Sequence, residues 1–258
     1  MNTLSLIVLN NVKPKPYDAP EVIIPLANHA SVAYLMEQFK SVTMGYLWKL
    51  VSGLSSPSKM PGYGYSISAF RCKVGGVLRK VEGSTCGDCY ACKGNYTRYP
   101  MIQECLERRY QSLSLGSVWV AAMATIMDRK RSKVKDTSVM RWHDSGDIQS
   151  VTHLRNLAMV MEFVPHIQGW LPTREYAMLE EYAATYGEFP SNLTVRVSAH
   201  MLGKSAPSRF KVSSIVLRPS DALPEGVSQC PAYTQGGYCL TCRNCWSKDI
   251  ATVAYPIH

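Results

Sequence analysis

Eight of the nine cysteines fall into two sets with the spacing of metal ligands. In each set, one cysteine precedes a triple whose members are separated by two residues. Clustered cysteines in a chain that keeps its thiols reduced bind metal more often than they form disulfides. The spacing therefore predicts two metal-binding modules. The first set is Cys72, Cys86, Cys89 and Cys92, and the second is Cys230, Cys239, Cys242 and Cys245.

The tight triples favour an iron–sulfur cluster over zinc. Structural zinc sites usually take two ligand pairs from separate turns. Three thiolates at these intervals instead surround one face of a cubane, as in bacterial ferredoxins. We expect one or two [4Fe–4S] clusters, with zinc as the alternative and disulfides or plain thiols as the least favoured interpretation. The ninth cysteine, Cys105, lies in a helical pattern and is typical of a small buried apolar residue.

The string from His143 to Asp147 concentrates polar side chains directly after an apolar segment. His143, Asp144 and Asp147 are candidate catalytic residues, because each could serve as a general acid, a general base or a metal ligand. The alternative is a simple turn, in which Asp144 and Ser145 cap the next segment and Gly146 supplies a positive φ.

Arg174 is a candidate anion-binding residue. A guanidinium can grip a carboxylate or phosphate at two points, and this one follows a predicted strand. The alternative is a structural ion pair with Glu175 or Asp147. His200 follows a later strand and is a further candidate, whereas Arg196 lies within that strand and is more typical of a structural residue.

The elements that would position these groups alternate between strands and helices. Such alternation predicts parallel pairing with right-handed crossovers, and ligands then gather at the carboxyl ends of the strands. The candidate side chains follow three successive strands, and no glycine-rich phosphate loop follows any of them. We therefore expect an α/β fold with a parallel core resembling a partial TIM barrel. The predicted strands are 138–142, 169–171, 193–197 and 212–217, and the predicted helices between them are 151–164 and 176–186.

The remaining segments complete a single predicted α/β domain over residues 1–258. Apolar residues at helical spacing predict helices in 31–51 and in 100–130, the latter with a break at 112–117. Residues 1–9 read as a first strand, and 55–65 as a loop. The predicted parts are an N-terminal wrap and helix (1–60), the first cysteine module (61–98), the β/α core (99–218) and the second cysteine module (219–258).

Composition places the chain among globular proteins. Of 258 residues, 46% are hydrophobic and 18% charged, which excludes a wholly disordered chain. The most apolar stretch, 118–127, is about half of the roughly 20 residues that a membrane span requires. The N-terminus lacks the features of a signal peptide, so we expect a cytoplasmic protein without membrane contact.

The formal charge is +9, which favours polyanionic partners. The densest basic run, 129–135, follows a predicted helix. It either complements the helix dipole or contacts nucleic acid.

Three strings of the sequence resemble the gene product 88-like proteins of bacteriophages. They are 83–96 (GSTCGDCYACKGNY), 142–147 (WHDSGD) and 239–246 (CLTCRNCW), and the likeness runs from about Pro61 to His258. The resemblance implies a phage-encoded protein of the infected cell that binds iron–sulfur, without assigning a reaction. The family pattern includes Cys72, Cys86 and Cys89 more consistently than Cys92.

A looser similarity links the chain to radical S-adenosylmethionine enzymes. Those enzymes combine a partial barrel with a cluster held by three cysteines, and the open iron takes the cofactor. Their C-x3-C-x2-C spacing differs from the spacing here, where two residues separate each cysteine of the triple from the next. A set of Cys72, Cys86 and Cys89 without Cys92 would still leave an iron open.

The leading hypothesis is a phage iron–sulfur protein that acts as a redox or radical-type enzyme on a small anionic substrate. An electron donor would be a second partner. The alternative from another class is a zinc-stabilised basic protein that binds nucleic acid or a host protein without catalysis. A third interpretation makes the clusters purely structural.

Overall fold

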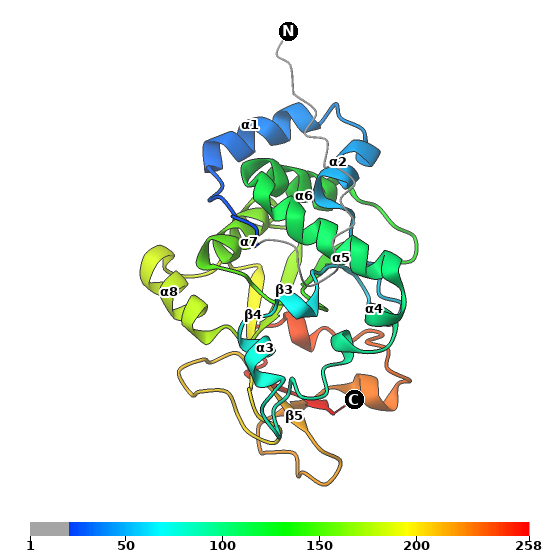
Figure 1. Cartoon of the computed structure of the whole chain (residues 1–258), viewed down its shortest axis with the longest axis vertical. Helices are drawn as coiled ribbons and strands as arrows, with labels where there is room; N and C mark the ends of the chain where they lie inside the picture. The colour runs from blue at the N-terminus through cyan, green and yellow to red at the C-terminus, as the bar shows by residue number, and fades with distance from the viewer. Residues whose placement is uncertain (1–20, 258) are drawn as a thin grey trace.

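Seven parallel strands form one sheet in the computed structural model, which describes residues 21–257 (Figure 1). Their order across the sheet is β1-β2-β3-β4-β5-β7-β6, and every neighbouring pair is parallel. The prediction of a parallel α/β core is therefore confirmed. The strands are β1 (Tyr63–Tyr65), β2 (Val139–Trp142), β3 (Gln168–Thr173), β4 (Leu193–Ser198), β5 (Ser213–Leu217), β6 (Ser228–Gln229) and β7 (Thr252–Pro256).

The first five strands lie side by side in chain order, as they would in a barrel. In the described part of the chain, however, β1 and β6 lie at the two ends of the sheet, so no closed barrel is formed. The partial-barrel interpretation stays a prediction. The strand predicted for residues 1–9 lies outside the described residues.

Strand β1 corrects the prediction of a continuous loop over 55–65. Its three residues, Tyr63-Gly64-Tyr65, are too few to show a period-two pattern, and glycines and prolines surround them. Pairing with β2 makes them a strand, with Tyr63 opposite Met140 and Tyr65 opposite Trp142. This element therefore depends on a partner that is distant in the sequence.

Helices cover one face of the sheet, and α3 and α4 lie in the first cysteine module. The helical region predicted for 31–51 is two helices, α1 and α2, and Thr43 caps the second. The break predicted near 112–117 is confirmed between α5 and α6. The helices are α1 (His29–Phe39), α2 (Met44–Val51), α3 (Val74–Leu78), α4 (Asn95–Arg98), α5 (Pro100–Ser112), α6 (Ser117–Arg129), α7 (Val151–Phe163) and α8 (Tyr176–Tyr186).

Alternate residues of the central strands point to opposite faces of the sheet. Trp142 and Leu171 belong to the main core, which is built with α6 and α7. Val139 and Trp170 instead pack with Cys245 and Trp246 in a second buried cluster. The second cysteine module thus covers the face that the helices leave free, and α1 and α2 pack outside α6 at the far end of the molecule (Figure 1). None of the helices within residues 21–257 has the length and apolar character of a membrane span.

Candidate metal centres

Gly146, which has a positive φ, allows the loop after β2 to pass very close to Ile67. Gly146 has φ +79°, and a Cβ there would lie 2.4 Å from Ile67 Cγ1 and 2.8 Å from the Ile67 carbonyl oxygen. The Ile67 backbone N–H also donates to the Ser145 carbonyl at 3.2 Å. Only glycine fits this close approach without strain. The turn interpretation of this string is therefore confirmed for Gly146, and the turn delivers Asp147 to the end of the sheet. The expected cap is wrong, because Ser150, and neither Asp144 nor Ser145, caps the next helix, α7.

Asp147 ties the ends of β2 and β3 together. The side chain is 5% exposed, Oδ2 accepts from the Arg174 backbone N–H at 2.9 Å, and Oδ1 accepts from the Ile148 N–H at 2.8 Å. Burial raises the pKa of Asp147, although its hydrogen bonds to Thr173, Arg174 and Ile148 act in the opposite direction. Two of the predicted candidates, Asp147 and Arg174, are thus neighbours in the structure.

Arg174 links the end of β3 to the first cysteine module. Its Nε donates to Thr85 Oγ1 at 2.9 Å, and among residues 21–257 its guanidinium forms no ion pair. Thr85 in turn donates its N–H to the carbonyl of His200, which follows β4, at 2.9 Å. The His200 ring stacks on Tyr176 and its Nε2 contacts the Arg174 carbonyl at 3.0 Å. The ends of β3 and β4 therefore meet next to Cys86.

The four thiols of the first set gather at this edge of the sheet. A Cβ at Gly75 would lie 3.5 Å from Cys86 Sγ and 3.6 Å from Cys72 Sγ, so both sulfurs face the same glycine. A hydrogen bond with the Cys92 thiol lowers the pKa of Cys89 to about 6, and the same bond raises the pKa of Cys92. The cysteine spacing seen in the sequence thus corresponds to a cluster of side chains in space.

The charged candidates act directly on these thiols. Burial raises the pKa of Cys72 well above its usual value, and the Asp147 carboxylate and the neighbouring thiols raise it further. Burial also raises the pKa of Cys86, whereas the Arg174 guanidinium lowers it. The first set therefore combines four thiols with one cation and one anion supplied by the strand ends.

Asp144 contacts the same module through two tyrosines. Tyr96 donates its hydroxyl to Asp144 Oδ2 at 2.8 Å, and Tyr90 donates to the Asp144 carbonyl oxygen. The other carboxylate oxygen, Oδ1, is buried without a hydrogen-bond partner in the described part of the chain. Asp144 therefore joins the loop after β2 to the residues that flank Cys89 and Cys92.

The His143 side chain points away from the first cysteine set, toward His153. Its side chain is 3% exposed, and its ring centroid lies 5.4 Å from that of His153 on α7, on the helical side of the sheet. Burial and the nearby Arg141 lower the pKa of His143 to about 3, so the ring is neutral. No described residue hydrogen-bonds to either of its ring nitrogens. Its contacts place it apart from the Asp147–Arg174 pair, and its catalytic role stays a prediction.

The second set lies on the opposite side of the sheet from α7. Cys245 is buried and shares a 3.1 Å hydrogen bond with the Tyr255 hydroxyl on β7. Burial is the main cause that raises the pKa of Cys239, and the nearby thiols Cys230 and Cys242 also raise it. The four cysteines are thus close to one another, as the spacing predicts.

Two residues hold the second set against β2 and β4. Trp246, in the short helix η5 (Asn244–Trp246), donates its indole N–H to the Met140 carbonyl at 2.8 Å. Arg196 is fully buried and donates to the carbonyl oxygens of Ser213, Ile250, Asn244 and Ser247. The structural interpretation of Arg196 is therefore confirmed.

Arg141 on β2 lies between the two sets. Its guanidinium stacks over Trp170 at 4.5 Å and donates to Met60 Sδ at 3.3 Å. Burial acts to lower the pKa of Arg141, but Tyr90 and Asp144 on the side of the first set, with Tyr255 and Cys245 on the side of the second, raise it overall. The sequence analysis missed this residue. The available signal was its position in the strand, where alternation directs it away from the main core.

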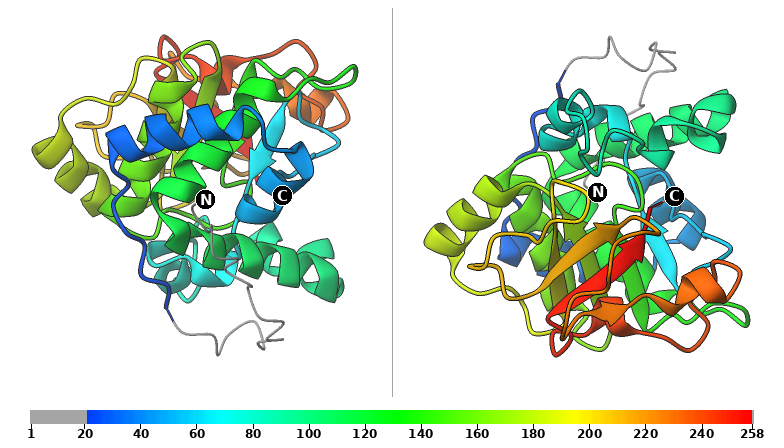
Figure 2. Two further views of the ribbon diagram at one scale, coloured as in Figure 1. Left: turned by 90° about the horizontal axis from the view of Figure 1, so that it is seen from above. Right: turned by 90° about the horizontal axis from the view of Figure 1, so that it is seen from below.

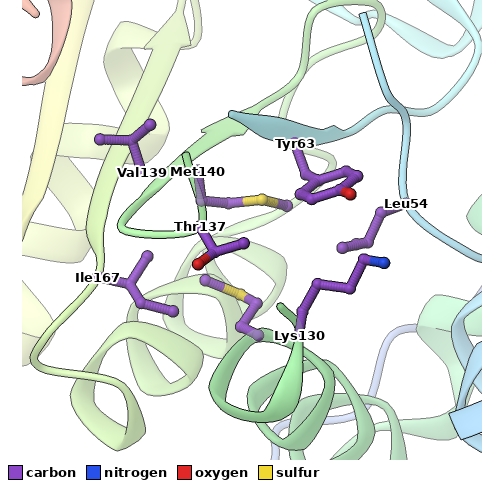
Figure 3. A pocket seen from close by; sticks show the side chains of 8 residues that line it. Leu54, Tyr63, Lys130, Thr137, Val139, Met140 and Ile167 are labelled. Atoms are coloured by element: carbon purple, nitrogen blue, oxygen red, sulfur yellow. The ribbon is translucent and has the colours of Figure 1, made fainter. Parts of the chain in front are cut away.

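Two observations describe what lies outside the candidate site or is not found in it. Within residues 21–257, no three His, Cys, Asp or Glu side chains are arranged to hold a single metal ion. A narrow pocket lies at the other end of the sheet, between the starts of β2 and β3 and the end of α6 (Figure 3). Its lining includes Tyr63, Lys130 and Val139 but none of the candidate site residues.

The fold and the site define an α/β protein in which two cysteine-rich modules flank one parallel sheet. A scan against protein families matches residues 48–248 to the family described as gene product 88. Because the match covers most of the chain, this protein belongs to the gene product 88 family, a family of phage gene products. Searches of curated proteins and of solved structures return no match to this chain.

Proposed function

We propose that this phage protein is an iron–sulfur protein whose first cysteine set binds a [4Fe–4S] cluster. The observation that carries the proposal is the convergence of the four first-set thiols at the carboxyl ends of β2, β3 and β4, beside Asp147 and Arg174. This is the edge at which parallel α/β folds place their ligands. Cys72, Cys86 and Cys89 are the proposed ligands, and Cys92 is the fourth unless it keeps its hydrogen bond to Cys89.

The residues present suit such a group. Thiolates are the usual ligands of iron–sulfur clusters, and the potential of a cluster depends on nearby charge and hydrogen bonds. Gly75 leaves open the space that a Cβ would fill next to Cys72 and Cys86. Arg174 and Arg79 lower the pKa of Cys89, so both act as cations beside the thiolates. Together these features favour a cluster whose negative charge is balanced by the protein.

We assign a second cluster to Cys230, Cys239, Cys242 and Cys245. Support comes from the mutual proximity of these thiols and from the buried hydrogen bond of Cys245 to Tyr255. Arg141 provides a cation next to Cys245 of this set, with Tyr90 and Asp144 of the first module on its other side.

The proposed activity is redox or radical-type chemistry on a small anionic substrate at the first set. Among the described residues, Arg174 donates from its Nε to Thr85, and its outer guanidinium nitrogens have no hydrogen-bond partner, so they are suited to bind a carboxylate or phosphate. A cluster bound there would supply one-electron chemistry. If Cys92 keeps its hydrogen bond to Cys89 and does not ligate, an iron is open for S-adenosylmethionine. The five strands in chain order are compatible with the partial barrel that such chemistry uses, and the proposed location is the cytoplasm of the infected host.

The test is metal and sulfide analysis after anaerobic purification, together with a visible spectrum. We expect a brown protein with iron and acid-labile sulfide in matching amounts. Cys242→Ser should lose part of the iron, whereas Cys105→Ser should keep all of it, because Cys105 belongs to neither set. A colourless protein with stoichiometric zinc would contradict the proposal and support the zinc-stabilised binding protein.

A second measurement addresses the open iron. Adding S-adenosylmethionine to the reduced protein should change the electron paramagnetic resonance signal of the first cluster, and Cys92→Ser should preserve that change. A signal that is insensitive to the cofactor would refute the radical chemistry but leave the iron–sulfur assignment intact.

A further inference from the structure

The basic run of the sequence lies beside the second cysteine module, although about a hundred residues separate them in the chain. Figure 2 shows the loop after α6 (green) next to the segment around 230–245 (orange). The loop at 57–60 joins them: Lys135 donates its Nζ to the Met60 carbonyl at 2.6 Å, and the Cys239 N–H donates to the Lys59 carbonyl at 3.0 Å. Three distant segments therefore form one surface.

Arg243 fixes the two outer loops of this surface to each other. Its Nη2 pairs with Asp136 Oδ2 at 2.9 Å, and its Nη1 donates to the Leu240 carbonyl at 2.7 Å. Asp136 is only two residues from Val134, so the tips that carry Val134 and Leu240 belong to one connected structure.

The exposed charges of this surface are positive. Lys59, Arg131 and Lys133 are exposed. The single acid of the adjoining run, Asp136, is paired with Arg243, and the sequence from 227 to 248 contains no Asp or Glu. A concentration of one sign steers partners of the opposite sign and accelerates their association.

Apolar side chains stand among these cations. Val134 is 88% exposed, Leu240 61% and Tyr238 44%, and the Lys59 ammonium lies 6.0 Å from the centre of the Tyr238 ring. Leu240 lies between Cys239 and Cys242 with φ +47°, a conformation that is unfavourable for leucine. Exposed apolar side chains grouped within a polar rim are typical of protein interaction sites. We name this region the basic–apolar surface and define it by Lys59, Arg131, Lys133, Val134, Tyr238 and Leu240.

We propose that the basic–apolar surface docks an acidic one-electron carrier protein, which reduces the centre at the second cysteine set. The inference rests on the proposed function, because it requires a redox cluster there. A partner that covers Leu240 lies directly against the loop that carries Cys239 and Cys242. The reduced carrier loses one electron, the oxidised cluster gains it, and no bond is made or broken. The aliphatic Val134 and Leu240 favour a protein over nucleic acid, which binds chiefly through phosphate contacts and aromatic stacking.

The test measures binding to the iron-loaded full chain by titration calorimetry at several salt concentrations. The probes are an acidic flavodoxin, an acidic [2Fe–2S] ferredoxin and a single-stranded oligonucleotide of about 20 nucleotides. We expect a carrier to bind with an affinity that falls as salt rises. Lys133→Glu and Val134→Asp should each weaken that binding by about tenfold. Lys40→Glu should not change it, because the exposed Lys40 directly follows α1 and lies outside this surface.

Leu240→Asn adds a variant that should fold well, because asparagine tolerates a positive φ better than leucine. It should weaken carrier binding and slow reduction of the second centre by the carrier, while dithionite reduces that centre as before. Iron-loaded protein that binds neither carrier would overturn the docking proposal and leave the proposed function standing. Binding of the oligonucleotide alone, abolished by Lys133→Glu, would overturn it in favour of a nucleic-acid surface. Protein without iron would refute the proposed function itself, and metal analysis detects that outcome independently.

Discussion

Replacing Gly146 by alanine should destabilise the protein more than the same change at another glycine with a matching φ. Gly146 and Gly187 have φ values of +79° and +78°. A Cβ at Gly146 would lie 2.4 Å from Ile67 Cγ1, whereas a Cβ at Gly187 would have no atom of the described residues within 4 Å. The pair therefore separates the cost of the backbone conformation from the cost of the clash.

The magnitudes follow from these two contributions. A strained φ costs about 1–3 kcal/mol of folding free energy for a residue with a Cβ. Forcing a methyl group into a packed interior adds about 1–3 kcal/mol. We expect Gly187→Ala to lose only the first amount and Gly146→Ala to lose both. For a chain of this size, the difference of about 2 kcal/mol corresponds to roughly 4–8 °C in Tm.

The assay is thermal and urea denaturation of the two variants beside the parent protein. Because the loop from Gly146 delivers Asp147 to Arg174, Gly146→Ala should also reduce the iron content of the first set, and Gly187→Ala should not. Equal losses of stability in the two variants would show that the loop is not held against Ile67. That result would refute the account of how this site is positioned.

Three further predictions concern single side chains. Arg196→Met should lower the free energy of unfolding by at least about 3 kcal/mol in urea denaturation, because buried carbonyls lose a charged donor; a smaller loss would show that water replaces it. Burial keeps His143 neutral with a pKa of about 3 against an ordinary 6.5, so the stability it contributes is present above pH 6.5 and is lost as the pH falls toward 3. His143→Asn should therefore flatten the dependence of Tm on pH between about 4 and 7, and an unchanged slope would contradict this assignment. In iron-loaded protein, Arg141→Gln should lower the midpoint potentials of both centres in a redox titration, since a nearby cation favours the reduced state of a cluster. Arg141→Lys should restore both potentials. A shift at one centre alone would show that the charge of Arg141 does not act on both cysteine sets.

The regular elements at the centre of the chain were predictable because their signals are local. Apolar spacing and glycine or proline boundaries predict β2, β3 and β4 and the helices α7 and α8, and the structure confirms them. Strand β1 was not predictable, because three residues carry no periodicity and only their pairing with β2 makes them a strand.

The candidate site divides in the same way. The polar side chains that follow β2 and β3 were identifiable, since parallel strands place their carboxyl ends at one edge. In the structure, His143 points toward His153, whereas Asp147 points toward Arg174. These directions depend on the close approach of the loop to Ile67, which no local sequence pattern indicates. Arg141 was missed for a related reason. The role of a charged residue inside a short strand can be recognised only when the modules on both sides of the residue are in place.

The sequence by itself determined the parallel α/β core, the two sets of cysteines and the membership of the gene product 88 family, because spacing along the chain encodes each of them. Only the tertiary structure decided that the first set lies at the carboxyl edge with Asp147 and Arg174, that the second set covers the opposite face from α7, and that the basic run lies beside it. The physical reason is that pairing of distant strands and burial of side chains against them bring together residues between which the sequence shows no relation.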